Sequence, residues 1–122
     1  MSKILDKVLR VGLLFDFYGA LLTDKQQRCL EMHYQNDLSL AEIADEFAVS
    51  RQAVHDILRR SEQILEEYEQ KLQLVERYQW EQQKLQQVYQ LIEAVPEQLR
   101  QLPEICLTLE TLRLLLDDAK EV

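Results

Sequence analysis

Polar side chains gather at the start of one expected helix in a pattern typical of nucleic-acid readers. Residues 50–60 read SRQAVHDILRR, and helical spacing divides them into a core face and an outer face. The core face would consist of Val54, Ile57 and Leu58. The outer face would consist of Arg51, Gln52, His55, Asp56, Arg59 and Arg60. Because arginine matches guanine edges and glutamine matches adenine edges in a major groove, we predict that Arg51 and Gln52 read bases.

Cations near this helix could contact the phosphates of the same nucleic acid. The candidates are Arg59, Arg60, Lys25 and Arg28. Asp56 opposes them, because it places a negative charge in the middle of the outer face. With so few clustered cations, binding is expected to be weak and to fall rapidly with salt. The alternative interpretation is an ordinary solvated surface on a helix that only packs.

The residues that enzymes and metal sites use are scattered along the chain. His33 and His55 stand alone, and the sequence has no glycine-rich phosphate loop, nucleophile elbow or HExxH run. Cys29 and Cys106 lack metal-ligand spacing and are expected to be buried, reduced thiols. We therefore predict a protein that is not an enzyme and that has no metal and no cofactor.

Two short helices joined by a tight turn are expected to position the outer-face residues. Ser39 and Glu42 form a capping-box pattern that begins the first helix, and Ser50 can cap the second. The small side chain of Ala44 leaves room for the second helix to cross closely. Helices joined in this way form a helix-turn-helix.

The rest of the chain is also expected to be helical, so we predict an all-α fold. The 122 residues include only two Gly and two Pro, and the chain is rich in residues that favour helices. The apolar spacing predicts a helix over residues 3–18, and Thr23 or Asp24 can cap the next one. Beyond Ser50, a single helix is expected to reach residue 95, because no Gly or Pro precedes Pro96.

This long helix carries a coiled-coil-like seam of apolar residues between residues 54 and 92. A last helix over residues 104–119 has apolar residues on several faces, so we expect it to fold back on the long helix. The stripe that is left would be covered by a second copy, which predicts a homodimer. Residues 1–61 would be the helix-turn-helix domain and residues 62–122 its dimerising extension.

The net charge of −8 is unevenly distributed along the sequence. Residues 1–61 contain eight Lys or Arg and nine Asp or Glu, whereas residues 62–122 contain six and thirteen. The first half is therefore better suited to meet a polyanion. No apolar run is long enough for a bilayer, and the N-terminus lacks a secretory signal pattern. We expect a cytoplasmic protein without membrane insertion.

Residues 21–65, LLTDKQQRCLEMHYQNDLSLAEIADEFAVSRQAVHDILRRSEQIL, resemble region 4 of bacterial sigma factors. Nearly the whole chain, including LFDFYGALLT and the Glu/Gln-rich long helix, more closely resembles the YlxM family of small bacterial proteins. This resemblance implies a sigma-region-4-like domain, a DNA-binding regulatory role and a part in the signal recognition particle (SRP) pathway. It would place Arg51, Gln52, His55 and Asp56 at base-reading positions. Ala48 departs from the motif, because sigma-like turns often have Gly there.

Two functions are compatible with the sequence. The first is a regulator that binds DNA or the SRP RNA through residues 50–60. The second is a non-catalytic adaptor that recruits the SRP protein or its receptor. Its motivation is the excess of apolar residues at Leu107, Leu114 and Leu115, together with the acidic second half.

Overall fold

The computed structural model describes the backbone of residues 3–120 and the side chains of residues 3–117. Helices account for all of the regular structure in that range, and the all-α prediction is confirmed. The elements are α1 (Lys3–Tyr18), the 3₁₀ turn η1 (Gly19–Leu21), α2 (Asp24–Leu30), the π-helical η2 (Glu31–Gln35), α3 (Leu40–Phe47), α4 (Arg51–Leu72), α5 (Leu74–Glu93), α6 (Glu97–Arg100) and α7 (Pro103–Lys120).

The chain divides into two compact units, one up to Val75 and the other from Glu76. The first unit extends past residue 61, where the sequence suggested a boundary. The reason is that α4 continues through this position without interruption, and Leu65 and Glu69 farther along it are buried.

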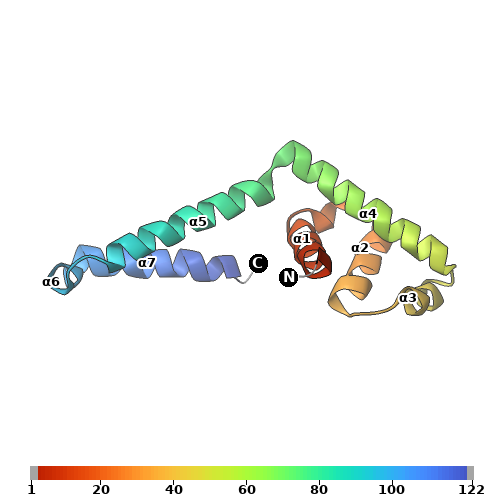
Figure 1. Cartoon of the computed structure of the whole chain (residues 1–122), viewed down its shortest axis with the longest axis horizontal. Coiled ribbons are helices and arrows are strands. Elements are labelled where there is room, and N and C mark those ends of the chain that lie inside the picture. The colour runs from red at the N-terminus through yellow and green to blue at the C-terminus, as the bar shows by residue number, and fades with distance from the viewer. Residues whose placement is uncertain (1–2, 121–122) are drawn as a thin grey trace. The chain divides into compact units, whose positions relative to one another are not determined.

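In the first unit, α1, α2 and α3 pack against α4 (Figure 1). Their apolar faces meet in one core. Its buried members include Val11, Leu14, Tyr18, Cys29, Leu30, Ile43, Ala44, Val54, Leu58 and Leu65. Burial of leucine-sized side chains at about 1.5–3 kcal/mol each is the main force that holds the three shorter helices on α4.

Capping boxes begin α2 and α3. The sequence predicted the box of α3, and for α2 it predicted only a cap at Thr23 or Asp24. The Thr23 side chain accepts a hydrogen bond from the Gln26 amide at 3.2 Å, and the Gln26 side chain accepts one from the Thr23 amide at 3.1 Å. Ser39 and Glu42 exchange equivalent bonds, both of 3.2 Å. Amide groups that a helix start leaves without partners are thereby satisfied within each motif.

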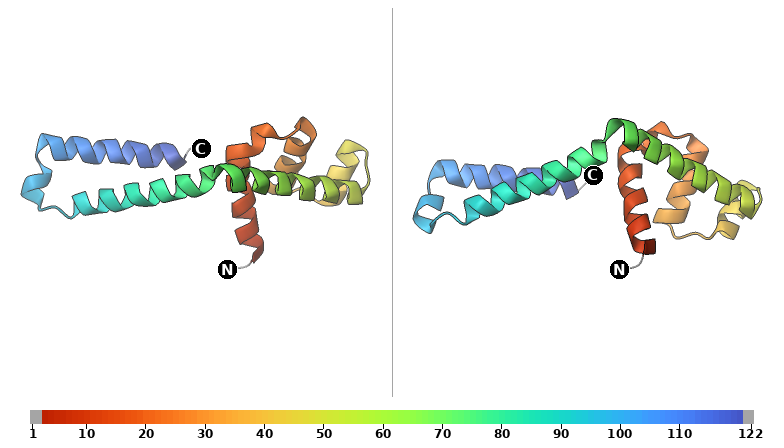
Figure 2. Two further views of the ribbon diagram at one scale, coloured as in Figure 1. Left: turned by 90° about the horizontal axis from the view of Figure 1, so that it is seen from above. Right: turned by 45° about the horizontal axis from the view of Figure 1, so that its top comes forward.

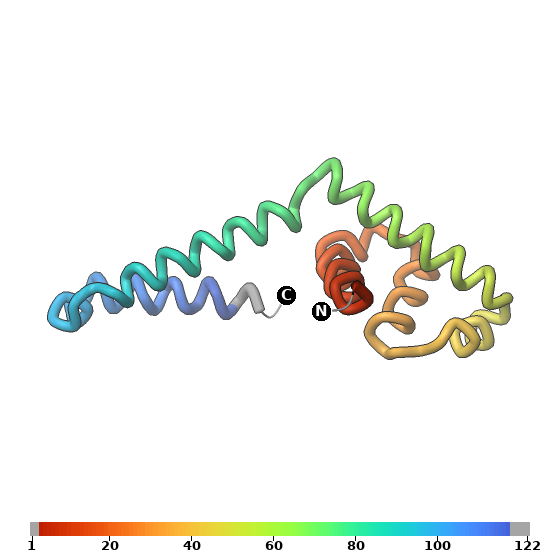
Figure 3. The backbone as a smooth tube through the Cα atoms, in the orientation of Figure 1, coloured from red at the N-terminus to blue at the C-terminus, as the bar shows by residue number. Residues whose placement is uncertain are grey.

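The prediction of a single helix from residue 51 to residue 95 is wrong, because the backbone leaves the helix at Gln73. The tube in Figure 3 shows α4 and α5 as two separate helices. Gln73 has a φ of 54°, in the left-handed region, and it separates α4 from α5. A residue other than Gly is unfavourable in this conformation, so contacts elsewhere in the fold must stabilise the break.

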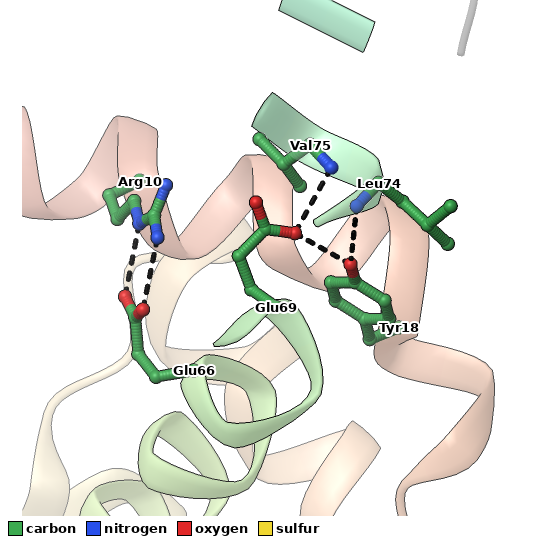
Figure 4. Close-up of polar contacts among 6 residues, drawn as sticks. All are labelled: Arg10, Tyr18, Glu66, Glu69, Leu74 and Val75. Carbon is green, nitrogen blue, oxygen red and sulfur yellow. Dashed lines mark hydrogen bonds and ion pairs between the residues drawn. The ribbon is translucent and has the colours of Figure 1, made fainter. Parts of the chain in front are cut away.

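Those contacts come from Tyr18 and Glu69, which are both buried (Figure 4). The Leu74 amide donates to Tyr18 Oη at 3.1 Å, and the Val75 amide donates to Glu69 Oε1 at 3.0 Å. The Tyr18 hydroxyl donates to the same Glu69 oxygen at 2.6 Å. Burial and this carboxylate both raise the pKa of Tyr18, which keeps its hydroxyl protonated as a donor. The first two amides of α5 therefore have partners from α1 and α4.

In the second unit, α5 and α7 run in opposite directions, connected through α6 (Figure 2). This agrees with the expected fold-back of the last helix, although the sequence did not predict α6. Arg113 Nη2 of α7 donates to Tyr89 Oη of α5 at 3.2 Å, and Leu112 of α7 is buried.

The two cysteines differ in exposure. Cys29 is buried in the first-unit core, as expected, and burial raises the pKa of its thiol. The expectation of burial was wrong for Cys106, which is exposed and donates its thiol hydrogen to the Arg100 carbonyl oxygen at 3.0 Å. Helical geometry places Cys106 away from the face of α7 that buries Leu112. No helix between residues 3 and 120 has the length and apolar character needed to cross a membrane.

Candidate nucleic-acid interface

The turn between α3 and α4 is defined by one left-handed residue and two hydrogen bonds. Ala48 ends α3 with a φ of 55°, in the left-handed region. The Val49 amide then donates back to the Ala44 carbonyl oxygen at 3.0 Å. Ser50 begins α4 by accepting a hydrogen bond from the Ala53 amide at 3.0 Å. The predicted helix-turn-helix is therefore present, with its second helix starting at Arg51.

Burial of the core face of α4 leaves the polar residues of its opposite face exposed. Val54 and Leu58 are buried and Ile57 is half-buried, whereas Arg51 and Gln52 are exposed. This is the orientation that base reading requires. It brings the two side chains to the helix start, where the unpaired amides also favour anions.

The side chain of Gln52 already has a partner on its own helix. Its Nε2 donates to Asp56 Oδ1 at 3.0 Å, and His55 Nδ1 lies 3.8 Å from the same oxygen. An exposed hydrogen bond of this kind stabilises by about 1 kcal/mol, so a base could displace it. Arg51 is consequently the more accessible of the two candidate base readers.

The cations proposed to contact phosphates lie in separate places. Lys25 and Arg60 line one hollow between α2 and α4, together with Asp56. Arg28 Cζ lies 5.1 Å from the centre of the Phe47 ring, and Arg28 Nη2 lies 4.0 Å from Glu46 Oε1, so contacts with α3 constrain this side chain. Only Lys25 and Arg60 are brought together in a way that suits one phosphate backbone.

Arg59 lies on a different groove, of about 870 Å³, between α1 and α4. Lys7 and Arg10 line the same groove, although the sequence did not predict that they lie near Arg59. They are neutralised there, because Lys7 Nζ lies 3.2 Å from Glu62 Oε1 and Arg10 donates twice to Glu66, both at 3.0 Å. The Glu66 carboxylate raises the pKa of Arg10. This groove is therefore not a concentrated cation site, and no sequence spacing could have placed α1 beside α4.

The excess of acidic over basic residues is the same in the two compact units. Residues 1–75 contain nine Lys or Arg and 13 Asp or Glu, whereas residues 76–122 contain five and nine. The acidic excess of the first unit includes Glu62, Glu66, Glu67 and Glu69, which follow Arg59 and Arg60 along α4. A polyanion would therefore be attracted to the start of α4 and repelled by its later turns. Among residues 3–117, no group of three or more His, Cys, Asp or Glu side chains is arranged to hold a metal ion.

Replacing Ala48 with glycine is expected to stabilise the turn. The φ of 55° is costly for alanine and not for glycine, so the free energy of unfolding should rise by about 0.5–1 kcal/mol in urea denaturation. Ala41→Gly, at an exposed position inside α3, is the matched control and should lower it by about 1 kcal/mol. A loss of stability in both variants would show that Ala48 is not strained.

Comparison with known proteins is consistent with this architecture. Residues 5–107 match the model of the UPF0122 family, described as "Putative helix-turn-helix protein, YlxM / p13 like". UPF0122 protein BH2485 of Halalkalibacterium halodurans is 48% identical over 109 residues, which cover 88% of this chain and 100% of that relative. UPF0122 protein ABC2295 of Shouchella clausii is 60% identical over 75 residues, covering 62% and 69% of the two chains. A UPF0122 protein of Bacillus cereus (strain Q1) is 48% identical over 104 residues, covering 83% and 94%.

The match spans both units, from α1 into α7, and includes the capped turn and the start of α4. The chain therefore belongs to the UPF0122 family of YlxM/p13-like helix-turn-helix proteins.

Proposed function

We propose that this protein is a DNA-binding regulatory protein that inserts the start of α4 into a major groove. The observation that carries the proposal is that Arg51 is exposed at the first position of α4. Ser50 caps this helix, and its buried core face fixes its orientation. Arg51 would donate to guanine, and Gln52 would contact adenine after release from Asp56. Lys25 and Arg60 would contact the adjacent phosphates, because they line one hollow beside α4. A homodimer would present two such helices to successive turns of the duplex.

Arg51→Ala is expected to weaken DNA binding about 10- to 100-fold, since one bidentate contact to a base contributes about 1–3 kcal/mol. A duplex selected from a randomised pool provides the ligand, and fluorescence anisotropy across a salt series provides the affinity. Asp56→Asn should strengthen binding, because it removes a negative charge beside Arg51 and loosens the hold on Gln52.

Lys71→Ala is the matched control, because Lys71 is an exposed cation in the last turn of α4, far from Arg51, and its loss changes the net charge equally. Its affinity should stay within about twofold of the wild type. Absence of salt-dependent binding to any duplex, or equal effects of Arg51→Ala and Lys71→Ala, would reject the proposed interface.

A second proposal is an adaptor role in the SRP pathway, which the family resemblance suggests. The observation that favours it is the exposed apolar face of α1, formed by Ile4, Leu5, Val8 and Leu9. Lys7 and Arg10 on the same helix turn toward α4, so this helix presents apolar residues to the outside. Such a face suits a groove on the SRP protein or its receptor.

Titration calorimetry of the purified SRP protein, its receptor and the SRP RNA with this chain tests the adaptor role. Binding to one of them that is lost in Leu5→Lys and kept in Arg51→Ala would support it. No heat of binding with any of the three would contradict it.

A further inference from the structure

The second unit lacks a core of its own. Among residues 76–117, Leu112 is the only buried side chain, and it is still 8% exposed. Helices of this length are marginal in water unless an apolar face is covered, and a hairpin of two helices supplies only one line of contact. The hairpin of α5 and α7 therefore needs a further surface against which to pack.

The apolar surface available for this purpose is large. Leu91 and Leu107 are 72% and 64% exposed, and four similar side chains accompany them. We call the six residues the outer apolar surface: Trp80, Val88, Leu91, Leu107, Leu114 and Leu115. They offer on the order of 500 Å² per copy, against about 800 Å² per partner in a standard interface, and flanking side chains can supply the remainder.

The hairpin of α5 and α7 has two broad sides, each formed by both helices, and only one of them suits a neighbouring helix pair. On one side, Gln86 of α5 and Arg113 and Asp117 of α7 line a polar hollow that also contains Tyr89. At about 100° of rotation per residue, Val88 and Leu115 lie on the opposite broad side. Trp80 and Leu91 lie about 60–80° farther round α5 than Val88, and Leu107 and Leu114 lie about 80–100° farther round α7 than Leu115, so all four border this side and not the polar one. The side that carries Val88 and Leu115 is therefore the apolar one.

The coiled-coil-like seam that the sequence predicted on the long helix is used within the chain. Tyr78, Gln82 and Tyr89 of that seam line the hollow that Arg113 and Leu116 of α7 also line. Tyr89 in addition accepts the hydrogen bond from Arg113. A second copy must consequently meet this hairpin through other residues.

We propose that two copies of this chain associate through the Val88 and Leu115 side of the hairpin, with the outer apolar surface closing a four-helix bundle. Charges favour a second copy over a strongly charged partner, because Arg77 and Lys84 are balanced by Glu81 and Glu104 around this side. Two-fold dimers bury the same patch on both copies, so one balanced apolar patch is sufficient. This inference rests on the dimer of the proposed function and identifies its surface.

Val88→Lys and Leu115→Lys test the surface in the full chain. Wild type should sediment at twice the chain mass of 14.5 kDa, and its melting temperature should rise with concentration. Each variant should raise the dissociation constant at least tenfold and lower the helical circular dichroism at dilute concentration, because the hairpin loses its cover.

Gln90→Lys is the matched control, since it makes the same charge change two residues away on the polar side of α5. It should leave the dissociation constant within about twofold of the wild type. A wild-type chain that stays monomeric at all concentrations would overturn both the dimer and its surface. A dimer that Val88→Lys and Leu115→Lys leave intact would overturn the surface alone, and DNA binding by Arg51 is measured independently of either result.

Discussion

Glu69→Ala is expected to lower the free energy of unfolding by about 2–4 kcal/mol. The substitution removes the acceptor of two buried donors, the Tyr18 hydroxyl and the Val75 amide. A buried donor without a partner costs about 1–3 kcal/mol, and the side chain also leaves a cavity. Urea denaturation followed by circular dichroism measures the loss.

Two variants separate this network from a general effect of removing a carboxylate. Glu69→Gln keeps an oxygen acceptor and should cost clearly less than Glu69→Ala. Glu67→Ala removes an exposed carboxylate two residues earlier on α4 and should stay within about 0.5 kcal/mol of the wild type. If Glu69→Ala matched Glu67→Ala, the hydrogen bonds at the helix break would have no net stabilising effect.

Ile43→Ala is expected to destabilise the first unit by about 2–5 kcal/mol, because Ile43 is fully buried where α3 meets α4. The same variant should lose DNA binding at temperatures where the first unit has melted, because α3 holds the start of α4 in place. Thermal melting and anisotropy on one sample series measure both effects.

The matched control is Ile4→Ala, the same substitution at a side chain that is 76% exposed. It should change the free energy of unfolding by no more than about 0.5 kcal/mol. Equal losses in the two variants would contradict the assignment of Ile43 to the core.

Local sequence signals predicted the parts of the fold that depend on neighbouring residues. The caps at Ser39 and Ser50 could be located, and the cap of α2 narrowed to Thr23 or Asp24, because each capping side chain bonds an amide only three residues away. The core face of α4 followed from helical spacing, so the outward orientation of Arg51 was also predictable. Its contact with a base remains a prediction.

Features that depend on distant residues could not be predicted. The break at Gln73 carries no Gly or Pro, and Glu69 is one glutamate among many in the same helix. Only the approach of Tyr18, more than fifty residues away, distinguishes them. The ion pairs of Lys7 and Arg10 with α4 were missed for the same reason, and so was the hydrogen bond that engages Gln52, which depends on side-chain rotamers.

The bonds among Tyr18, Glu69 and Val75 also order events during folding. The contacts of Tyr18 with Glu69 and Leu74 join segments more than fifty residues apart, and they form late because the intervening chain must first be brought together. Within residues 51–93 the Val75 amide can already reach Glu69, but the Leu74 amide gains its partner only when Tyr18 of α1 docks. The left-handed conformation of Gln73 is therefore expected to be fully populated only after α1 has packed against α4.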